Sequence, residues 1–385
     1  MNFTLACDIM MDLEGSIRPA MYLARELNAR GHKVSIVSPM MSKDVEKRLE
    51  ADGMMPVNLH ARLAAKNSGL SVMWFETWSR EAFLKLNSRH VDNDSSLTIN
   101  FSQVISVPSA VWYLQGPPSF ALEDMEKELS TGFRIAYSIL KPLIQYADGR
   151  LISHMGKISS SIIANSNFCA SMYSSFGIHV NDVIYPPIDC REFQPSTTNP
   201  TNDYVLTYFG KETEFSAIRR VADLGVKIKA FGSKTPYIEK NLKKHTNIDF
   251  VGRVTTSQLV GLYSNALFTI FPFTHEPFGY IPLESMACGT PVLTYDVQGP
   301  SECVIDGDTG WLVHTQTEIV KKAVKYWKNG FRLTMRRKCV SEASKFDKKI
   351  YTDKWLRMLE IYCENHAVLC PTIDILRSNG NYVTQ

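Results

Sequence analysis

The chain has 385 residues, of which 44% are hydrophobic and 21% are charged. This is the composition of a globular protein, and it excludes a disordered or collagen-like chain. The length predicts two or three domains, and two is the number we expect. The net charge of +3 is too small to indicate a nucleic-acid-binding protein.

The first forty residues predict a strand, a loop, a helix and a second strand. Residues 3–7 form an apolar run typical of a buried strand. Ser16 can cap a helix whose apolar residues recur at helical spacing over 17–27, and Gly31 ends it. Residues 34–37 predict the next strand. A strand–helix–strand opening favours a parallel sheet, and the absence of a GxGxxG fingerprint argues against a nicotinamide or flavin dehydrogenase.

The rest of the first half is less regular. Residues 40–110 show no clear periodicity, and strands are predicted only within short apolar runs. A helical region follows, and then two strands of which the second leads into a proline-stiffened exit. The predicted strands are 72–75, 97–101, 110–114, 161–166 with its turn, and 183–189, and the predicted helix covers 121–146.

A segment rich in Pro, Thr, Ser and Asn, residues 195–202, is the best candidate for an interdomain linker. The alternation of strands and helices then restarts, so we expect two successive α/β domains. The predicted domains are 1–194 and 195–350, followed by a C-terminal helix and tail, 351–385, that can pack back on the first domain. The predicted strands of the second domain are 205–209, 226–231, 248–251, 267–271 and 292–294.

The eight cysteines never form a CxxC pair, and most lie within apolar runs, as expected for small buried hydrophobes in a reducing compartment. No apolar run approaches the roughly 18 residues that a membrane span needs. The first residues lack the basic and apolar regions of a signal peptide. The sequence therefore predicts a cytoplasmic protein.

The most informative run is HEPFGYIPLESMACGTP, residues 275–291. It follows a buried strand, so it lies at a strand's carboxyl end, where open α/β sheets bind ligands. Gly279 permits a close approach of backbone amides, and Pro282 suits the first turn of a short helix. Glu276 and Glu284, with seven residues between them, can therefore bind two parts of one ligand, and carboxylate oxygens match vicinal hydroxyls of a sugar.

This run resembles the E-x7-E signature of the retaining glycosyltransferases of family 4, which have the GT-B fold. Further segments are similar to that family, and the resemblance covers roughly residues 1–40 and 160–360. They are LAREL with GHKV in the first 40 residues, ANSNF at 164–168, YPPID at 185–189, GPSE at 299–302 and DGDTGWLV at 306–313.

The resemblance implies two Rossmann-like α/β domains whose parallel sheets face a central cleft. The N-terminal domain would bind the acceptor, and the C-terminal domain would bind a nucleotide-sugar donor. No cofactor or metal is implied, and a UDP- or GDP-sugar would be the donor. The acceptor would be a glycan or a lipid-linked molecule.

The resemblance also assigns roles to residues. Glu276 would hydrogen-bond the transferred sugar near the reaction centre, Lys211 would neutralise the diphosphate, and Glu284 would hold the ribose hydroxyls. A cation is required because the leaving diphosphate gains negative charge in the transition state. Glu276 and Lys211 are therefore the implied catalytic residues. The implied donor-binding residues are Gly15, Gly210, Lys211, Arg253, Glu276, Pro277, Phe278, Gly279, Tyr280, Ile281 and Glu284.

The sequence departs from the family pattern at two positions. The family carries a second cation five residues after the first, where this chain has Ser216. Lys234 and Arg253 are the alternative cations. Gln115 stands where many members place a histidine near the acceptor, and an amide cannot take a proton. His154 and His275 are better interpreted as structural histidines.

The resemblance thus implies a retaining, metal-independent transferase in which the donor's own β-phosphate helps to deprotonate the acceptor. The alternatives are a catalytically weak GT-B protein that serves as an assembly or regulatory subunit, and an epimerase of similar fold, which the E-x7-E run disfavours. The polar triplets at 92–94 and 306–308 are interpreted as turns rather than as metal ligands. The basic stretch 321–349 is either a solvated helical face or a contact with anionic lipid headgroups, which would place the protein peripherally at the inner membrane face.

Overall fold

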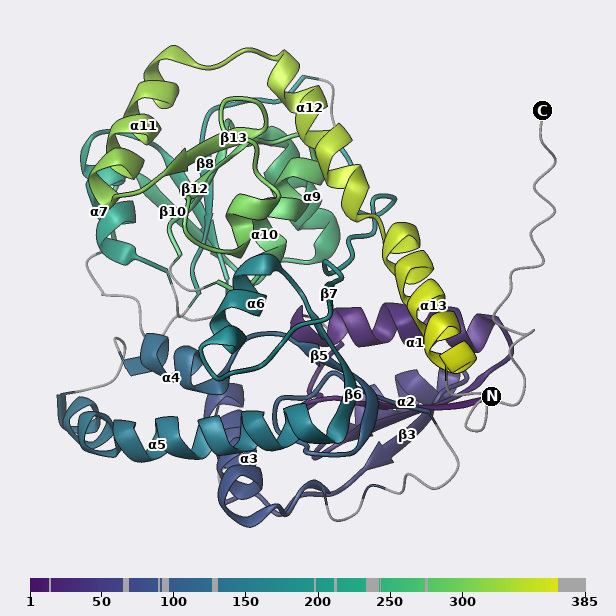
Figure 1. Cartoon of the computed structure of the whole chain (residues 1–385). Helices are drawn as coiled ribbons and strands as arrows, with labels where there is room; N and C mark the ends of the chain where they lie inside the picture. The colour runs from purple at the N-terminus through teal and green to yellow at the C-terminus, as the bar shows by residue number, and fades with distance from the viewer. Residues whose placement is uncertain are drawn as a thin grey trace, which may run out of the picture.

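The computed structural model describes residues 1–13, 15–64, 69–88, 91, 97–126, 131–196, 199–210, 213–232, 242, 244–273 and 276–365. Figure 1 shows two domains, each built around its own sheet, with the N-terminal half of the chain below and most of the C-terminal half above. This confirms the prediction of two α/β domains with parallel sheets.

The N-terminal domain has a sheet that is seven-stranded in the described part of the chain, with every pairing parallel. In spatial order the strands are β3 (Met55–Asn58), β2 (Lys33–Ser38), β1 (Asn2–Ala6), β4 (Leu97–Asn100), β5 (Ser109–Leu114), β6 (Ser159–Ala164) and β7 (Asp182–Val183). The helices are η1 (Gly15–Ile17), α1 (Arg18–Ala29), α2 (Lys43–Ala51), α3 (Leu70–Leu84), α4 (Pro118–Glu126), α5 (Thr131–Ile158) and α6 (Asn167–Ser174).

The C-terminal domain repeats this plan with a parallel sheet that has six strands among the described residues. In spatial order these are β10 (Ile248–Gly252), β9 (Ile228–Phe231), β8 (Val205–Tyr208), β11 (Thr269–Phe271), β12 (Val292–Tyr295) and β13 (Gly310–Val313). The helices are α7 (Phe215–Asp223), α9 (Thr256–Asn265), α10 (Tyr280–Ala287), η4 (Gly299–Glu302), α11 (Gln316–Asn329), α12 (Thr334–Ala343), η5 (Ser344–Phe346) and α13 (Lys348–Asn365).

Central strands such as β5 and β12 are mostly apolar and buried along their whole length because both faces of each sheet are covered by helices. All six residues of β5 are buried, as are all four of β12. Continuous apolar runs of this kind distinguish buried parallel strands from the alternating pattern of a half-exposed sheet. The same runs allowed these strands to be predicted from the sequence.

Helix α13 belongs to the N-terminal core although it follows the C-terminal domain in the chain. Its Trp355 packs against Phe101 and Tyr113, with ring centroids 5.4 Å and 5.6 Å apart, and the Tyr351 hydroxyl donates to the Pro19 carbonyl at 2.8 Å. Figure 1 shows α12 and α13 descending from the upper domain to α1. The chain therefore crosses between the domains twice.

The two crossings are hydrogen-bonded to each other. The Ile188 N–H donates to the Phe346 carbonyl at 2.9 Å, and the Lys348 N–H donates to the Ile188 carbonyl at 2.8 Å. The Lys348 ammonium also donates to the Asp189 carboxylate. The two connections thus form one short, braced joint.

The prediction of a strand at 72–75 is wrong, because these residues lie within α3. Their aromatic and β-branched side chains favour a strand, but the buried positions Met73, Thr77, Trp78 and Glu81 recur at helical spacing. This helical spacing does not show as an apolar pattern in the sequence, because Thr77 and Glu81 are polar. The buried Glu81 carboxylate is stabilised by hydrogen bonds that it accepts from backbone N–H groups after the helix.

Other boundaries differ from the prediction. Strand β7 covers only two residues; after it the Ile184 N–H still donates to the Ala164 carbonyl at 3.0 Å, and Ile188 forms an isolated bridge with Asp347. The predicted helix 121–146 is two helices, α4 and α5, of which α5 extends to Ile158. Strands β3 and β13 were not predicted. Among the described residues, no helix is both long enough and apolar enough to cross a membrane.

Candidate functional site

A cavity of about 390 Å³ lies between the two domains. Both sheets contribute to it through loops at the carboxyl ends of their strands, where ligands bind in open α/β sheets. Its described lining residues are Gly15, Ser16, Arg18, Gln115, Asn165, Pro186, Tyr208, Phe231, Leu259, Phe271, Phe273, Glu276, Pro277, Phe278, Gly279, Tyr280, Ile281 and Glu284.

The N-terminal domain contributes the start of its first helix and the ends of two strands. Gly15, Ser16 and Arg18 lie where η1 leads into α1, and Ile17 at the N-cap makes no side-chain capping bond. Gln115 follows β5, and Asn165 follows β6. The Asn165 side chain is 5% exposed and its Oδ1 has no hydrogen-bond partner, so it presents an unpaired acceptor at the cavity wall.

The C-terminal domain contributes the loop between β11 and α10. Gly279 has φ +89°, and a Cβ built there would lie 2.8 Å from Cγ of Pro300, so a larger residue would be both strained and obstructed. The loop is fixed at its start, because the Glu276 N–H donates to Gln298 Oε1 at 3.2 Å. The loop is also bound by the N-terminal domain, because the Ser166 hydroxyl of that domain donates to the Pro277 carbonyl at 2.5 Å.

Glu284 lies on the first turns of α10 and is 3% exposed. Arg18 Nη1 donates to Glu284 Oε1 at 2.5 Å across the cavity, and the Tyr263 hydroxyl donates to Glu284 Oε2 at 3.2 Å. Burial, with a contribution from Glu284, raises the pKa of Tyr263 well above its ordinary value. The phenol therefore stays protonated and remains a donor to the carboxylate.

The structure brings most of the predicted donor-binding residues together. Gly15, Glu276 and Glu284 all line the cavity, as does the whole segment from Pro277 to Ile281. Two predicted residues are not part of its wall: Gly210 is buried after β8, and Arg253 is exposed after β10. Lys211, His275, Lys234 and the triplet Asp92-Asn93-Asp94 lie outside the described residues.

The two departures from the family pattern have structural partners. The Ser216 hydroxyl accepts a hydrogen bond from Gln316 Nε2 at 2.6 Å. The adjacent Glu214 binds the Tyr295 hydroxyl and Gln316 Nε2. Gln115 lines the cavity, and its Nε2 donates to the Phe101 carbonyl at 2.9 Å. The position of the second cation is thus occupied by an uncharged hydroxyl, which is bound in a network that also holds the Glu214 carboxylate and the Arg220 guanidinium.

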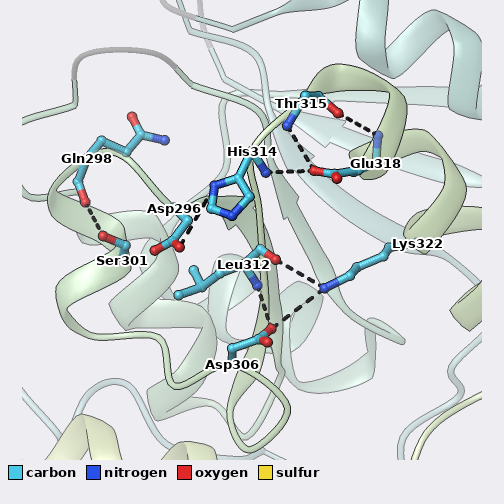
Figure 2. A network of polar contacts seen from close by, with 9 residues as sticks. All are labelled: Asp296, Gln298, Ser301, Asp306, Leu312, His314, Thr315, Glu318 and Lys322. Carbon is cyan, nitrogen blue, oxygen red and sulfur yellow. Dashed lines mark hydrogen bonds and ion pairs between the residues drawn. The ribbon is translucent and has the colours of Figure 1, made fainter.

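The turn that follows the E-x7-E run is stabilised by its own acidic residues (Figure 2). Asp306 Oδ1 accepts from the Leu312 N–H at 2.9 Å and lies 3.7 Å from the Lys322 ammonium. Asp308 pairs with Lys338 at 2.5 Å. These carboxylates hold a turn, as the sequence predicted for this triplet. In the part of the chain that the structure describes, no group of three or more His, Cys, Asp or Glu side chains is arranged to hold a metal ion.

Several cations of the basic stretch 321–349 are bound within the protein. Lys322, Lys338 and Lys345 pair with carboxylates or carbonyls of the same domain, and Lys348 pairs with Asp189. Arg336 is largely buried and donates to carbonyls of Ala266 and Gly289. These contacts favour a structural face over a lipid-binding one.

Sequence reasoning missed Arg18 and Asn165 as cavity residues. Arg18 lies 266 positions from its partner Glu284, and no local pattern signals such a pair. Asn165 was noted only as part of a family-like segment. The signal that could have identified both is their place directly after a predicted loop or strand at the cavity edge of the sheet.

Comparisons with known proteins agree with this geometry. Residues 232–346 match the family described as glycosyl transferases group 1, and the match includes the E-x7-E run. An alpha-1,3/1,6-mannosyltransferase, alg-2, from Neurospora crassa is 25% identical in an alignment of 210 residues, and the match covers 40% of this chain and 45% of that protein. The chain matches less than half of the length of such curated relatives.

Two solved structures cover nearly the whole chain. Anabaena Alr3699/HepE in complex with UDP has a TM-score of 0.65 at 15% identity, over 93% of this chain and 99% of that one. Sucrose-phosphate synthase from Thermosynechococcus elongatus has a TM-score of 0.66 at 14% identity, over 95% and 99%. With its two facing parallel-sheet domains, the chain has the GT-B fold.

Proposed function

We propose that this protein is a retaining glycosyltransferase that moves a sugar from a nucleoside diphosphate donor to an acceptor hydroxyl. The observation that carries the proposal is the interdomain cavity, in which Glu276, Glu284 and the amides of 278–281 face Gly15 of the other domain. The group 1 match over 232–346 supports the reaction class. The UDP bound to the Anabaena protein supports a nucleotide-sugar donor.

The cavity offers each part of such a donor a suitable partner. Glu284 can accept bonds from ribose hydroxyls, and the start of α10 presents N–H groups without intrahelical partners to a phosphate. Glu276 would hydrogen-bond the transferred sugar, and Lys211 would approach the diphosphate. Because the described lining holds no carboxylate besides Glu276 and Glu284, which both have a role already, we propose that the donor's β-phosphate takes the acceptor proton on the same face. No metal or cofactor takes part in this proposal.

The acceptor would enter from the N-terminal domain and would be a glycan or a lipid-linked sugar. The relative alg-2, a mannosyltransferase, supports a hexose as the transferred group. Closure of the two domains on the donor would exclude water and so prevent hydrolysis. We place the reaction in the cytoplasm.

The first experiment is a thermal-shift panel of UDP-, GDP- and ADP-sugars, because a ligand that binds the folded state raises the melting temperature. The donor that gives a shift is then used in an assay of nucleotide release, with the anomeric configuration of the product read by NMR. Inversion at the anomeric carbon would contradict the retaining mechanism.

Glu276→Gln tests the role of the carboxylate in the same assay. We expect a loss of roughly a hundredfold or more in kcat, since the charge is removed where the transition state forms, with nucleotide affinity almost unchanged. Glu342→Gln is the matched control, because Glu342 pairs with Lys345 on the outside of the same domain. A fully active Glu276→Gln variant would exclude this role.

A second candidate function is a nucleotide-sugar-binding subunit with little turnover. The uncharged Ser216 hydroxyl, which is bound to Gln316, and the engagement of Gln115 with a carbonyl favour it, since both stand where the family has titratable or charged groups. A thermal shift with no measurable turnover of any donor would support this candidate over the enzyme.

A further inference from the structure

Arg18 occupies an unusual position in the cavity. It begins α1, three residues after Gly15, and its guanidinium reaches across to the other domain. Nη1 is 2.5 Å from Glu284 Oε1, and the guanidinium carbon is 5.0 Å from the centre of the Tyr280 ring. Among the described residues that line the cavity, Arg18 is the only lysine or arginine.

Without Arg18, the charge of the described part of the lining does not suit a diphosphate. The described wall holds two carboxylates, Glu276 and Glu284, against this single guanidinium. A nucleoside diphosphate brings at least two more negative charges, and it gains further charge as it leaves. The position at which the family pattern has its second cation holds Ser216, which is bound to Gln316.

The surroundings of Arg18 are otherwise favourable to an anion. Both α1 and α10 begin at the cavity, and neither has a side-chain cap on its first N–H groups. Helix starts carry partial positive charge and leave N–H groups without partners. The same wall also contains a buried acceptor without a hydrogen-bond partner, Asn165 Oδ1, which indicates a ligand with hydroxyl donors.

The pairing with Glu284 is one that a nucleotide can exchange. Glu284 keeps its bond from Tyr263 when Arg18 leaves, so the carboxylate does not become an unpartnered buried charge. The Arg18 side chain is 22% exposed, so it has room to turn. The planar fork of a guanidinium also fits two phosphate oxygens at once.

We propose that Arg18 is an exchangeable cation of the donor site. In the nucleotide-free protein Glu284 holds it, and it occupies the place of the ribose. The ribose of an incoming nucleotide takes over Glu284, and the released guanidinium binds the diphosphate, which supplies the positive charge that Ser216 lacks. This inference rests on the proposed function, because it needs a nucleoside diphosphate in the cavity.

The test compares nucleosides with nucleoside diphosphates, since only the latter engage the released guanidinium. UDP, GDP and ADP, and uridine, guanosine and adenosine, are titrated by calorimetry into the wild-type protein and into Arg18→Gln, Arg18→Lys and Arg30→Gln. Arg30 is the matched control, because it ends the same helix and pairs with Glu26 outside the cavity. Melting temperatures of all variants verify that they fold.

For Arg18→Gln we expect the affinity for the cognate nucleoside diphosphate to fall about 10- to 100-fold, the effect of losing a charged hydrogen bond. Affinity for the matching nucleoside should stay the same or rise, because Glu284 is no longer occupied by a cation. Arg18→Lys should recover part of the loss, since lysine keeps the charge without the fork. Arg30→Gln should match the wild type for both ligands.

The possible failures are distinguishable. If the wild type binds none of the three diphosphates, the proposed function fails, and this inference fails with it. If the wild type binds one but Arg18→Gln keeps the wild-type ratio of diphosphate to nucleoside affinity, Arg18 is only an interdomain ion pair, and this inference alone is overturned. If Arg18→Gln lowers the affinities for the diphosphate and for the nucleoside equally, this inference is overturned as well.

Discussion

Two glutamates of the C-terminal domain, Glu284 and Glu302, both bind the N-terminal domain, but in different settings. Glu302 accepts four hydrogen bonds of 2.7 to 2.9 Å. Three come from the start of α6, namely from the Asn167 N–H, the Asn167 side-chain amide and the Phe168 N–H, and the fourth comes from the Tyr185 hydroxyl. Glu284 accepts one from Arg18 and one from Tyr263, and it lines the cavity. Glu302 does not line it.

Glu302 therefore forms a fixed contact between the domains, whereas Glu284 belongs to a site that a ligand can occupy. Backbone donors at a helix start cannot turn away from Glu302, and burial together with Glu302 raises the pKa of Tyr185, so that its phenol remains a donor. The Arg18 side chain can turn away from Glu284. Contacts that look alike as interdomain bonds therefore have opposite roles, one holding the domains and one yielding to a ligand.

The largest expected effect is that of Glu302→Ala. Loss of the carboxylate removes the acceptor of the Asn167 and Phe168 N–H groups, while the Tyr185 hydroxyl keeps the bond that it accepts from Asn167 Nδ2, and we expect unfolding stability to fall by roughly 2–4 kcal/mol. Urea denaturation measures the change. Glu342→Ala removes a glutamate of the same domain whose partner Lys345 is exposed, and it should change the unfolding stability by less than about 1 kcal/mol. Equal effects of the two substitutions would show that Glu302 is not a joint.

Gly116→Ala tests the same fixed side of the cavity. Gly116 has φ +119°, and a Cβ there would lie 2.7 Å from Cγ of Pro277 in the other domain. We expect a loss of about 1–3 kcal/mol from strain and overpacking, measured by thermal unfolding. The double variant Gly116→Ala, Pro277→Ala should recover the part that comes from overpacking. If the double variant recovers no stability, the whole loss comes from backbone strain at residue 116.

Glu284→Gln tests the yielding side. We expect about tenfold weaker nucleoside binding, because an amide has fewer acceptor sites for ribose hydroxyls, while unfolding stability changes much less than in Glu302→Ala. Calorimetry with the cognate nucleoside measures the affinity. The comparison breaks down if Glu284→Gln destabilises the protein as strongly as Glu302→Ala and leaves nucleoside binding intact.

The smallest effect concerns the brace between the two crossings, where Lys348 binds Asp189. Desolvation raises the pKa of Asp189, but the hydrogen bonds from Lys348 and from backbone N–H groups outweigh it, and the net shift is downward. A lowered folded-state pKa gives stability that is present above the unfolded pKa of about 4 and is lost as the pH falls through the folded value.

Because the pair is partly exposed, we expect it to contribute less than about 1 kcal/mol. Urea denaturation of the wild type and Asp189→Asn between pH 7 and pH 2 should show the two stabilities converging below pH 4. A constant difference across this range would contradict the assignment of the effect to this carboxylate.

Much of the fold was predictable because its strands are buried on both faces. Continuous apolar runs made it possible to predict strands such as β5 and β12. The position of Glu276 and Glu284 after a buried strand indicated a ligand site, and the family resemblance added Gly15, which lines the same cavity. Helix α3 was not predictable in this way, since the buried Glu81 interrupts its apolar pattern with a charge that only tertiary hydrogen bonds explain.

The interdomain partners were also beyond local patterns. The bond between Arg18 and Glu284 joins residues 266 positions apart, and the bonds of Glu302 to Asn167 join residues 135 apart. Such pairs depend on how two finished domains meet. Gly210 and Arg253 show the converse, because the family resemblance assigned them to the donor site and neither belongs to the described wall of the cavity.

The return of α13 to the N-terminal core has a consequence for biosynthesis. A ribosome releases the strands of that domain first, yet Trp355 and Tyr351, which complete its apolar interior, emerge only after the whole C-terminal domain has been translated. The first domain to be made is thus the last to be finished. A nascent chain halted before residue 348 exposes the apolar surface that α13 covers, and this is the stage at which a chaperone has most to protect.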